Sequence, residues 1–366
     1  MEKKISQLFE YLDWRGDLDF DASPFNEVDA GILCLLSYLD FTGLVPKEFS
    51  GETYDIKKIN SLYFGRALPP DLRVIDLLRA CAKTNRFSKI LPYGYVSKLD
   101  GDEEKQFCGI TFVLPSKKKQ ACIVFRGTDV TLIGWKEDFN MIFTYPVPSQ
   151  EEALVYLEKA TFAMRNYDLI LAGHSKGGNA AIYASSLCSK RAYNRLTCIY
   201  TFDSPGFDKD LVDTSIFSRP AEKTKSYLPK DSIIGLLMEN STPFSVVESD
   251  AFGFMQHDIF SWELQNINFK RVEGLSTFSK NAKKTITKWL ELLDLNQRRD
   301  FVNSLFRILE ECNIYEVRDF EKISFSTVVT ALKTFSDLDD TSKECVLKAI
   351  GLFFKAAHNR DDIDFE

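Results

Sequence analysis

The chain has 366 residues, of which 45% are hydrophobic and 27% are charged. This balance excludes the disordered, collagenous and coiled-coil classes, and the length predicts a globular protein of one large domain with an appendage, or two modest domains. With 46 basic against 53 acidic residues the net charge is −7. The chain therefore lacks the basic excess of a general nucleic-acid binder, and we expect no nucleic-acid partner, although a local basic patch stays open.

The N-terminus leads directly into a charged amphipathic stretch, without the apolar segment of a signal peptide. No apolar run approaches the length of a membrane span. The eight cysteines are scattered without CxxC pairs, and several lie in apolar runs, where thiols are usually buried. We expect free thiols, no transmembrane segment and a cytoplasmic location.

The first part of the chain is predicted to be helical. Apolar residues recur at helical spacing around Ile5–Leu12 and Val28–Leu39, on either side of a structured turn, and a further helix is predicted over Asp71–Lys83. We interpret residues 1–90 as an N-terminal helical segment that packs on the core.

The pattern then changes to short runs rich in β-formers. Three strands are predicted, at Tyr93–Leu99, Phe107–Leu114 and Gln120–Phe125, separated by polar turns. Ser149–Glu152 reads as a capping box at the start of the next helix. These strands are expected to form a meander.

A strand, a helix and a strand follow at Leu169–Ala172, Gly178–Lys190 and Thr197–Phe202. This order predicts a βαβ crossover and a parallel sheet, so residues 91–278 are expected to form an α/β core. Beyond Phe278 the apolar spacing is helical throughout, which predicts a C-terminal helical module over 279–366 that ends in a solvated acidic tail, Asp361–Glu366.

The sequence Gly173-His174-Ser175-Lys176-Gly177 is a G-x-S-x-G motif between a predicted strand and a predicted helix. Glycines two residues before and after the serine permit a sharp strand-to-helix turn, which exposes the Ser175 hydroxyl at a helix N-terminus. The same turn directs the backbone N–H of Lys176 at an oxyanion. The motif alone is weak, but this context makes Ser175 a candidate nucleophile.

A serine nucleophile needs a base, and the chain has three histidines. His174 adjoins the serine and is expected to pack beside the turn, and His358 lies in the C-terminal tail region. His257 follows a loop-like stretch and comes after the serine, in the order Ser, acid, His of α/β-hydrolases. We therefore expect His257 to be the base.

The acid should follow a strand between the serine and His257. Asp231 is favoured, because Pro229-Lys230-Asp231 follows a short predicted strand, Lys225–Leu228. Asp203, directly after Thr197–Phe202, is the second candidate. Its alternative role is to cap the end of the strand.

The second oxyanion donor is expected at the end of an earlier strand. Gln120–Phe125 runs into a glycine turn, which makes the Thr128 N–H the candidate donor, with the Thr128 hydroxyl as a further one.

Five separated motifs together resemble the class 3 lipase family. They are Phe125–Thr128, Trp135–Asp138, Gly173–Gly178, Thr201–Pro205 and Leu228–Ile233. The resemblance covers roughly residues 90 to 265 and implies an α/β-hydrolase fold. It implies that Ser175 is the nucleophile, Asp231 the orienting acid, His257 the base, and Thr128 with Lys176 the oxyanion donors. Trp14–Asp17 and Ser23–Glu27 further resemble an uncharacterised bacterial branch of lipase-like proteins.

Two features depart from that family. Lys176 stands where class 3 lipases usually carry leucine, and fewer residues separate Ser175 from His257 than in secreted members. By the resemblance the lid would lie at about Asp129–Tyr145, where Trp135 and Phe139 could cover an apolar substrate pocket. An ordinary amphipathic helix packed on the core explains the same spacing.

These observations predict a serine hydrolase that cleaves carboxylic esters, lipid-like acyl esters in particular, through an acyl-enzyme. Two alternatives stay open: a catalytically vestigial binding or scaffold protein with the same fold, and a thioesterase or acyltransferase with the same triad. The expected partner is a small-molecule or lipid ester, with transient contact with a membrane surface left open, and the oligomeric state is not predicted. The sequence shows neither a metal-ligand cluster nor a phosphate-binding loop, so no metal and no cofactor are expected.

Overall fold

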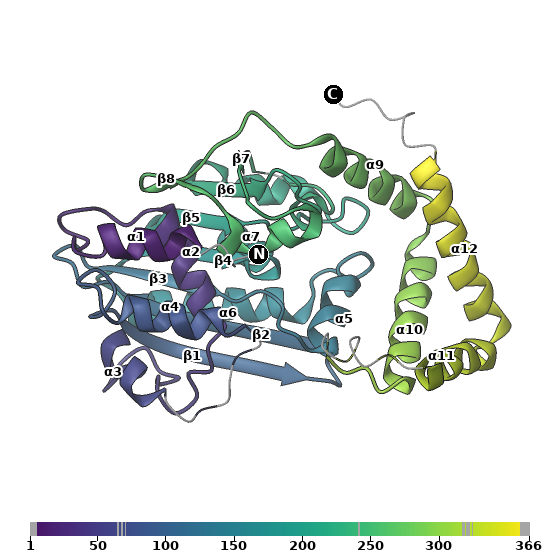
Figure 1. Ribbon diagram of the computed structural model, residues 1–366, viewed down its shortest axis with the longest axis horizontal. Helices are drawn as coiled ribbons and strands as arrows, with labels where there is room; N and C mark the ends of the chain where they lie inside the picture. The colour runs from purple at the N-terminus through teal and green to yellow at the C-terminus, as the bar shows by residue number, and fades with distance from the viewer. Residues whose placement is uncertain are drawn as a thin grey trace.

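The computed structural model describes residues 6–63, 66, 69, 71–240, 242–316, 319, 323 and 325–358. The predicted acidic tail, Asp361–Glu366, lies outside these residues. A mostly parallel sheet forms the centre, with helices on both of its faces and a group of C-terminal helices at one end (Figure 1). The predicted α/β class is confirmed at this level.

The central sheet has seven strands whose spatial order follows the chain. They are β1 (Leu91–Asp100), β2 (Lys105–Val113), β3 (Gln120–Phe125), β4 (Asp168–His174), β5 (Leu196–Phe202), β6 (Thr224–Pro229) and β7 (Phe244–Val247). β1, β2 and β3 pair antiparallel, and every later pair is parallel. The predicted meander and the predicted βαβ crossover are therefore confirmed.

Helices cover both faces of this sheet. One face carries α1 (Gln7–Arg15), α2 (Glu27–Leu36), α3 (Ile56–Leu62) and α4 (Arg73–Cys81), and the other carries α6 (Pro148–Ala163), α7 (Lys176–Leu187) and α8 (Lys190–Arg195). Alternation along β3 explains the two layers, since Cys122 and Val124 join the first core while Ile123 and Phe125 join the second. α3 is a helix that the apolar spacing did not predict.

The start of α6 differs from the prediction. The helix begins at Pro148, and the side chain of Gln150 accepts a hydrogen bond from the Val147 N–H at 3.0 Å. The predicted capping box at Ser149–Glu152 is therefore wrong by two residues. Proline suits the first helical position because its φ is already helical and its missing N–H has no partner to lose there.

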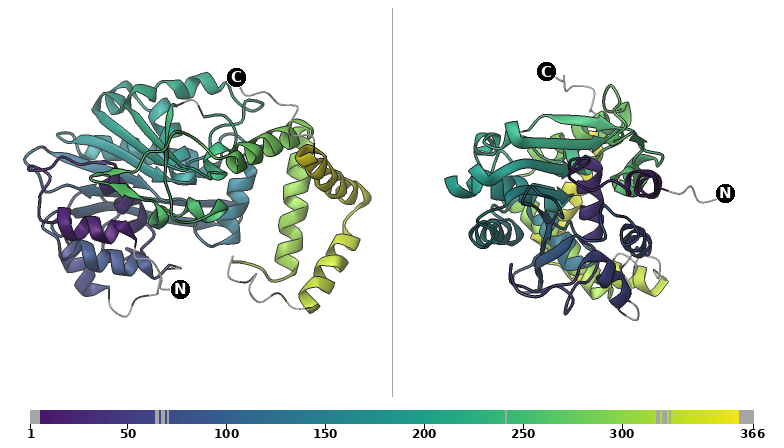
Figure 2. Two further views of the ribbon diagram at one scale, coloured as in Figure 1. Left: turned by 45° about the horizontal axis from the view of Figure 1, so that its top comes forward. Right: turned by 90° about the vertical axis from the view of Figure 1, so that its left-hand side faces the viewer.

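The C-terminal helices are α9 (Thr277–Glu291), α10 (Leu295–Glu311), α11 (Phe325–Asp337) and α12 (Asp340–His358). Figure 1 and the left-hand view of Figure 2 show them projecting at one end of the sheet, and Figure 1 shows α10 beside α5 (Leu132–Asn140). Phe306 of α10 packs edge-on against Phe139 of α5, with ring centroids 5.6 Å apart. The buried Arg298 of α10 binds Asp208 at 2.8 Å and Asp210 at 2.9 Å, so α10 is attached to the sheet through the loop after β5.

Short elements complete the fold. They are the 3-10 helices η1 (Thr214–Ser218), η2 (Ala221–Lys223), η3 (Ile234–Leu236), η4 (Gly253–His257) and η5 (Ile259–Ser261), and the strands β8 (Leu264–Gln265) and β9 (Asn268–Phe269). The division of the chain at residues 90 and 278 stays a prediction.

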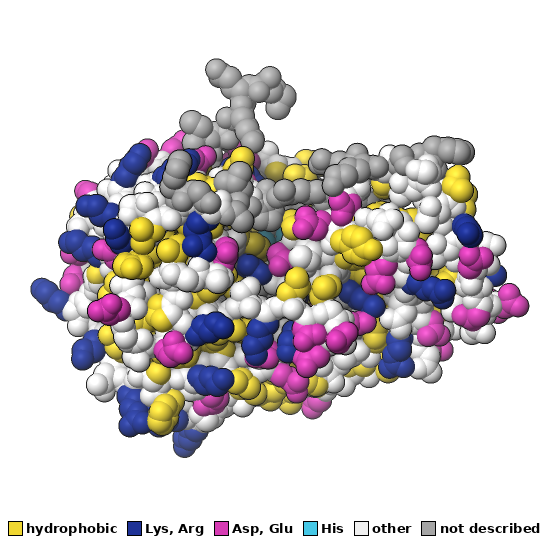
Figure 3. Space-filling view, turned by 90° about the horizontal axis from the view of Figure 1, so that it is seen from below, with side chains coloured by type: hydrophobic (Ala, Val, Ile, Leu, Met, Phe, Trp, Pro, Cys, Tyr) yellow, Lys and Arg dark blue, Asp and Glu magenta, His cyan; other side chains and the backbone are white. Residues whose placement is uncertain are grey.

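Three further observations bear on the sequence analysis. All eight cysteines are free thiols. Among the described helices, none combines the length and apolarity needed to cross a bilayer. The face seen in Figure 3 carries acidic and basic side chains interspersed with hydrophobic ones, without a continuous basic patch.

Candidate active site

Ser175 lies at the turn between β4 and α7. Its φ of 57° and ψ of −132° place a non-glycine residue in a strained backbone conformation, as expected of a nucleophile elbow. A Cβ at Gly173 would lie 2.3 Å from the backbone of Gly177, and a Cβ at Gly177 would lie 2.0 Å from the Phe125 carbonyl oxygen. Both glycines are therefore required for the turn, for the steric reason that the sequence motif suggested.

His257 ends η4 and turns its imidazole toward the end of β5. Its Nδ1 lies 2.6 Å from Oδ2 of Asp203, a carboxylate that is only 1% exposed. Asp203 is itself held through Oδ1, which accepts hydrogen bonds from the Ser232 hydroxyl and the Gly235 N–H. The structure thus brings the imidazole and a fixed, buried carboxylate together.

Asp231, the acid favoured by the sequence, has different partners. Its Oδ2 accepts hydrogen bonds from the Gly253 N–H at 3.1 Å and from the Gln256 side chain at 3.0 Å. Asp231 therefore binds the loop that carries His257 rather than the imidazole. The sheet order agrees with this: Asp203 follows β5, which directly neighbours β4, the strand that leads into Ser175, whereas Asp231 follows β6, one strand farther away.

The loop after β3 approaches the elbow closely. A Cβ at Gly127 would lie 3.1 Å from the Ser175 Cβ and 2.7 Å from the His174 carbonyl oxygen, so only glycine fits there without displacement. The next residue, Thr128, uses its hydroxyl to donate to Asp138 at 2.5 Å. Of the two donors expected from Thr128, this leaves the backbone N–H for an oxyanion.

Lys176 follows the nucleophile, and its N–H is one of the first amides of α7, which have no partner within the helix. Its side chain is 3% exposed, and its ammonium lies 2.7 Å from Glu137 of α5 and 3.5 Å from Asp138. Burial raises the pKa of Asp138, against the opposing effects of Lys176 and Thr128. The side chain that follows Ser175 is thus one half of a buried ion pair with α5.

That ion pair attaches the segment predicted as a lid. Glu137 is fully buried and also accepts hydrogen bonds from the backbone N–H groups of Gln106 and Ser149. Trp135 of the same helix is 36% exposed, whereas Phe139 packs against Phe306. Trp135 and Phe139 therefore do not share one environment.

One apolar side chain lies against the His257 imidazole, and others on the same segment are exposed. The ring of Phe254 stacks on His257 at a centroid distance of 6.0 Å, and Phe252 contacts Phe278 of α9 at 6.1 Å. Phe252, Phe254 and Met255 are exposed. This apolar surface was not predicted, although the sequence Phe252-Gly253-Phe254-Met255 could have indicated it.

The contacts of His257 do not include the Ser175 hydroxyl. In the described part of the chain, Ser175 Oγ and His257 Nε2 form no hydrogen bond with each other. Catalytic hydrogen bonds are often long before substrate binds, so the gap does not argue against a shared role.

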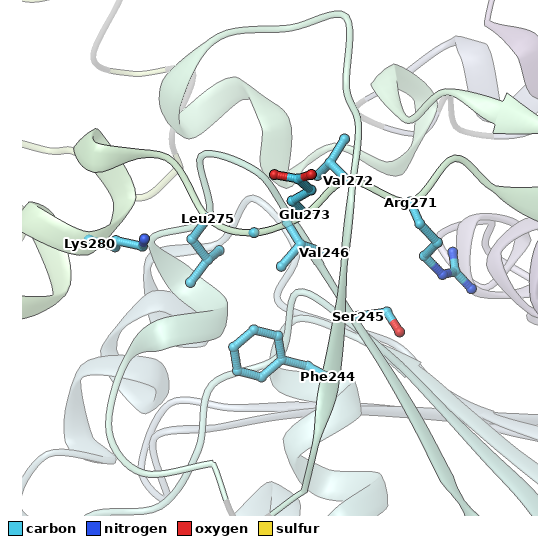
Figure 4. Close-up of a pocket in the computed structure, with 9 residues that line it drawn as sticks. Phe244, Ser245, Val246, Arg271, Val272, Glu273, Leu275 and Lys280 are labelled. Atoms are coloured by element: carbon cyan, nitrogen blue, oxygen red, sulfur yellow. The ribbon is translucent and has the colours of Figure 1, made fainter. Parts of the chain in front are cut away.

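A pocket of about 440 Å³ lies away from these residues (Figure 4). It is lined by β7 from Phe244 to Val246, by the segment from Arg271 to Leu275 and by Lys280 of α9, and contains none of the candidate catalytic side chains. No group of histidine, cysteine and carboxylate side chains suited to a metal ion occurs among the described residues.

A family model described as Mbeg1-like matches residues 81–307, which span the sheet, the elbow, Asp203 and His257. This chain belongs to the Mbeg1-like family. The family match includes α9 and most of α10 but stops before α11 and α12. No curated protein matches this family member. The resemblance to an uncharacterised bacterial branch stays a prediction.

Solved structures similar to this Mbeg1-like chain include fungal lipases. One, solved with an inhibitor, is 15% identical, with a TM-score of 0.37, over 60% of this chain and 77% of its own. Rhizomucor miehei lipase with its propeptide is 12% identical, with a TM-score of 0.31, over 59% and 67% of the two chains. A deletion mutant of the same complex is 13% identical, with a TM-score of 0.34, over 67% and 80%.

Proposed function

We propose that this protein is a serine hydrolase of α/β-hydrolase fold that cleaves carboxylic esters through an acyl-enzyme. The observation that carries the proposal is the combination of a strained Ser175 at a strand-to-helix turn with a His257 imidazole bound to the buried Asp203. In this proposal Asp203 takes the orienting role that the sequence assigned to Asp231.

Each group has a defined task in the reaction. Ser175 Oγ attacks the acyl carbon while His257 Nε2 accepts the hydroxyl proton, and the carbonyl electron pair moves onto its oxygen. Asp203 holds the Nδ1–H and stabilises the imidazolium. The backbone N–H groups of Lys176 and Thr128 stabilise the oxyanion.

Collapse of the tetrahedral intermediate completes the first half-reaction. The carbon–oxygen bond to the alcohol breaks, and the alcohol leaves with the proton from His257. Water then attacks the acyl group of Ser175 with His257 again as base, which releases the carboxylic acid and restores the serine.

The surroundings of the imidazole favour an apolar acyl group. Phe254 stacks on His257, Phe252 and Met255 of the same segment are exposed, and Trp135 is partly exposed on α5. Burying one methylene of a chain against such side chains is worth about 0.8 kcal/mol. Lipid-like acyl esters are therefore the proposed substrate class, and the proposed partner is the ester itself.

The test is covalent labelling with a fluorophosphonate, followed by intact mass. We expect one adduct on the wild-type chain, no adduct on Ser175→Ala, and an unchanged adduct on Ser97→Ala, an exposed serine of β1. Hydrolysis of p-nitrophenyl esters should fall by several orders of magnitude in Ser175→Ala alone. A wild-type chain that is neither labelled nor active would instead support the vestigial binding protein.

A further inference from the structure

His174 is buried beside the base, with a partner on each ring nitrogen. Nε2 lies 2.8 Å from the backbone carbonyl oxygen of His257, and Nδ1 lies 3.2 Å from the hydroxyl of Tyr38. The two imidazole rings are 4.4 Å apart between centroids. The sequence predicted only that His174 packs beside the elbow.

These contacts fix the tautomer of His174. A carbonyl oxygen accepts hydrogen bonds and cannot donate them, so Nε2 must carry the proton. In a neutral imidazole the other nitrogen is then an acceptor, and the Tyr38 hydroxyl donates to Nδ1. Burial, reinforced by the neighbouring His257, lowers the pKa of His174 to about 3, so the ring is neutral at physiological pH.

We propose that His174 and Tyr38 are positioning residues of the hydrolase site: His174 holds the main chain of His257, and Tyr38 holds His174 in the tautomer that can do so. This inference rests on the proposed function. His257 is then fixed at two points, by Asp203 through its ring and by His174 through its carbonyl group. Misplacement of a catalytic group by about 1 Å can cost about 100-fold in rate, so loss of the His174 contact with the His257 carbonyl group is expected to slow the reaction.

Tyr38 also contacts the other half of the site. A Cβ on Gly127 would lie 2.6 Å from the Tyr38 hydroxyl, so this hydroxyl lies directly against the loop that presents Thr128. Tyr38 comes two residues after the end of α2. The N-terminal helical segment therefore reaches both the base and the oxyanion loop.

Three substitutions separate positioning from packing. His174→Phe keeps the ring volume without either polar contact, His174→Gln keeps an N–H donor near the position of Nε2, and Tyr38→Phe removes the hydroxyl alone. A matched control is Tyr193→Phe, because the Tyr193 hydroxyl also bonds to a backbone carbonyl, that of Arg219, but lies elsewhere.

The measured quantities are the second-order rate constant of fluorophosphonate labelling, kcat and KM for an ester, and the melting temperature. We expect labelling and kcat to fall by about 100-fold in His174→Phe with little change in KM, and by about tenfold in Tyr38→Phe. His174→Gln should recover at least tenfold of the loss, and Tyr193→Phe should match wild type. Equal losses of labelling rate and kcat in His174→Phe and His174→Gln, or no loss in either variant, would overturn the inference.

A second measurement does not depend on catalysis. With only three histidines in the chain, ¹⁵N-histidine NMR can assign the tautomer of His174. We expect the Nε2–H form in wild type and a mixture of both forms in Tyr38→Phe. An Nδ1–H form in wild type would refute the inference, whereas absence of labelling and turnover in wild type would refute the proposed function.

Discussion

The buried Lys176–Glu137 ion pair predicts that α5 is a fixed wall of the site rather than a mobile lid. The two charged groups are 2.7 Å apart, Glu137 is fully buried and Lys176 is 3% exposed. Removing one partner of such a pair leaves an uncompensated charge and typically costs about 3–5 kcal/mol, a large part of the roughly 5–15 kcal/mol that stabilises a whole domain. The perturbations are Lys176→Met and Glu137→Gln.

The two changes damage the pair in different ways. Lys176→Met leaves the Glu137 carboxylate buried with its two backbone N–H donors, those of Gln106 and Ser149, but without a cation. Glu137→Gln leaves one amide oxygen for two N–H donors that lie on separate carboxylate oxygens, so one backbone N–H also loses its partner. We expect about 3 kcal/mol or more from each, with Glu137→Gln the larger.

The assay is equilibrium urea unfolding of both single variants and the double variant. Because the side chains touch, the double variant should lose less than the sum of the single losses, with a coupling energy of about 1–3 kcal/mol. Lys209→Met is the control: the Lys209–Glu291 pair is about half exposed and 3.4 Å long, so its loss should cost less than about 1 kcal/mol. If the single substitutions at Lys176 and Glu137 cost as little stability as this control, the ion pair does not fix α5, and the interpretation of α5 as a mobile lid would be favoured again.

Asp203→Asn should lower kcat by about 10⁴-fold because His257 loses its orienting partner, whereas Asp231→Asn should lower kcat far less. Steady-state kinetics of the two variants tests this, and the reverse ranking would identify Asp231 as the orienting acid. Because burial lowers the pKa of His174 to about 3 while the unfolded chain titrates near 6.5, stability is lost as the pH falls through the unfolded value. Urea unfolding at pH 7.5 and 5 should show a loss of about 2 kcal/mol that is absent from His174→Gln, and an identical pH response of the two chains would contradict it. Trp135→Ser should raise KM for long-chain esters more than for acetate esters, and an equal effect at all chain lengths would show that Trp135 does not contact the acyl chain. Phe139→Ser should mainly lower the melting temperature, because Phe139 packs on α10.

The sequence by itself determined the parts of this protein that depend on neighbours in the chain. Short apolar runs rich in β-formers predicted β1 to β6, and the glycines around Ser175 predicted the elbow, because a strand-to-helix turn is a property of a few consecutive residues. His257 could be selected because only three histidines exist. The acid could not, since Asp203 and Asp231 both follow parallel strands.

Only the tertiary structure decided which side chains meet. The path of the loop from Ala251 to His257 brings the imidazole to Asp203 and leaves Asp231 to hold the loop. The contact of Tyr38 with His174 joins positions 136 residues apart in the chain, and that of Lys176 with Glu137 joins positions 39 apart. No local pattern encodes such pairings, because their energy arises when packing removes both partners from water, and the fold alone determines which groups are buried together.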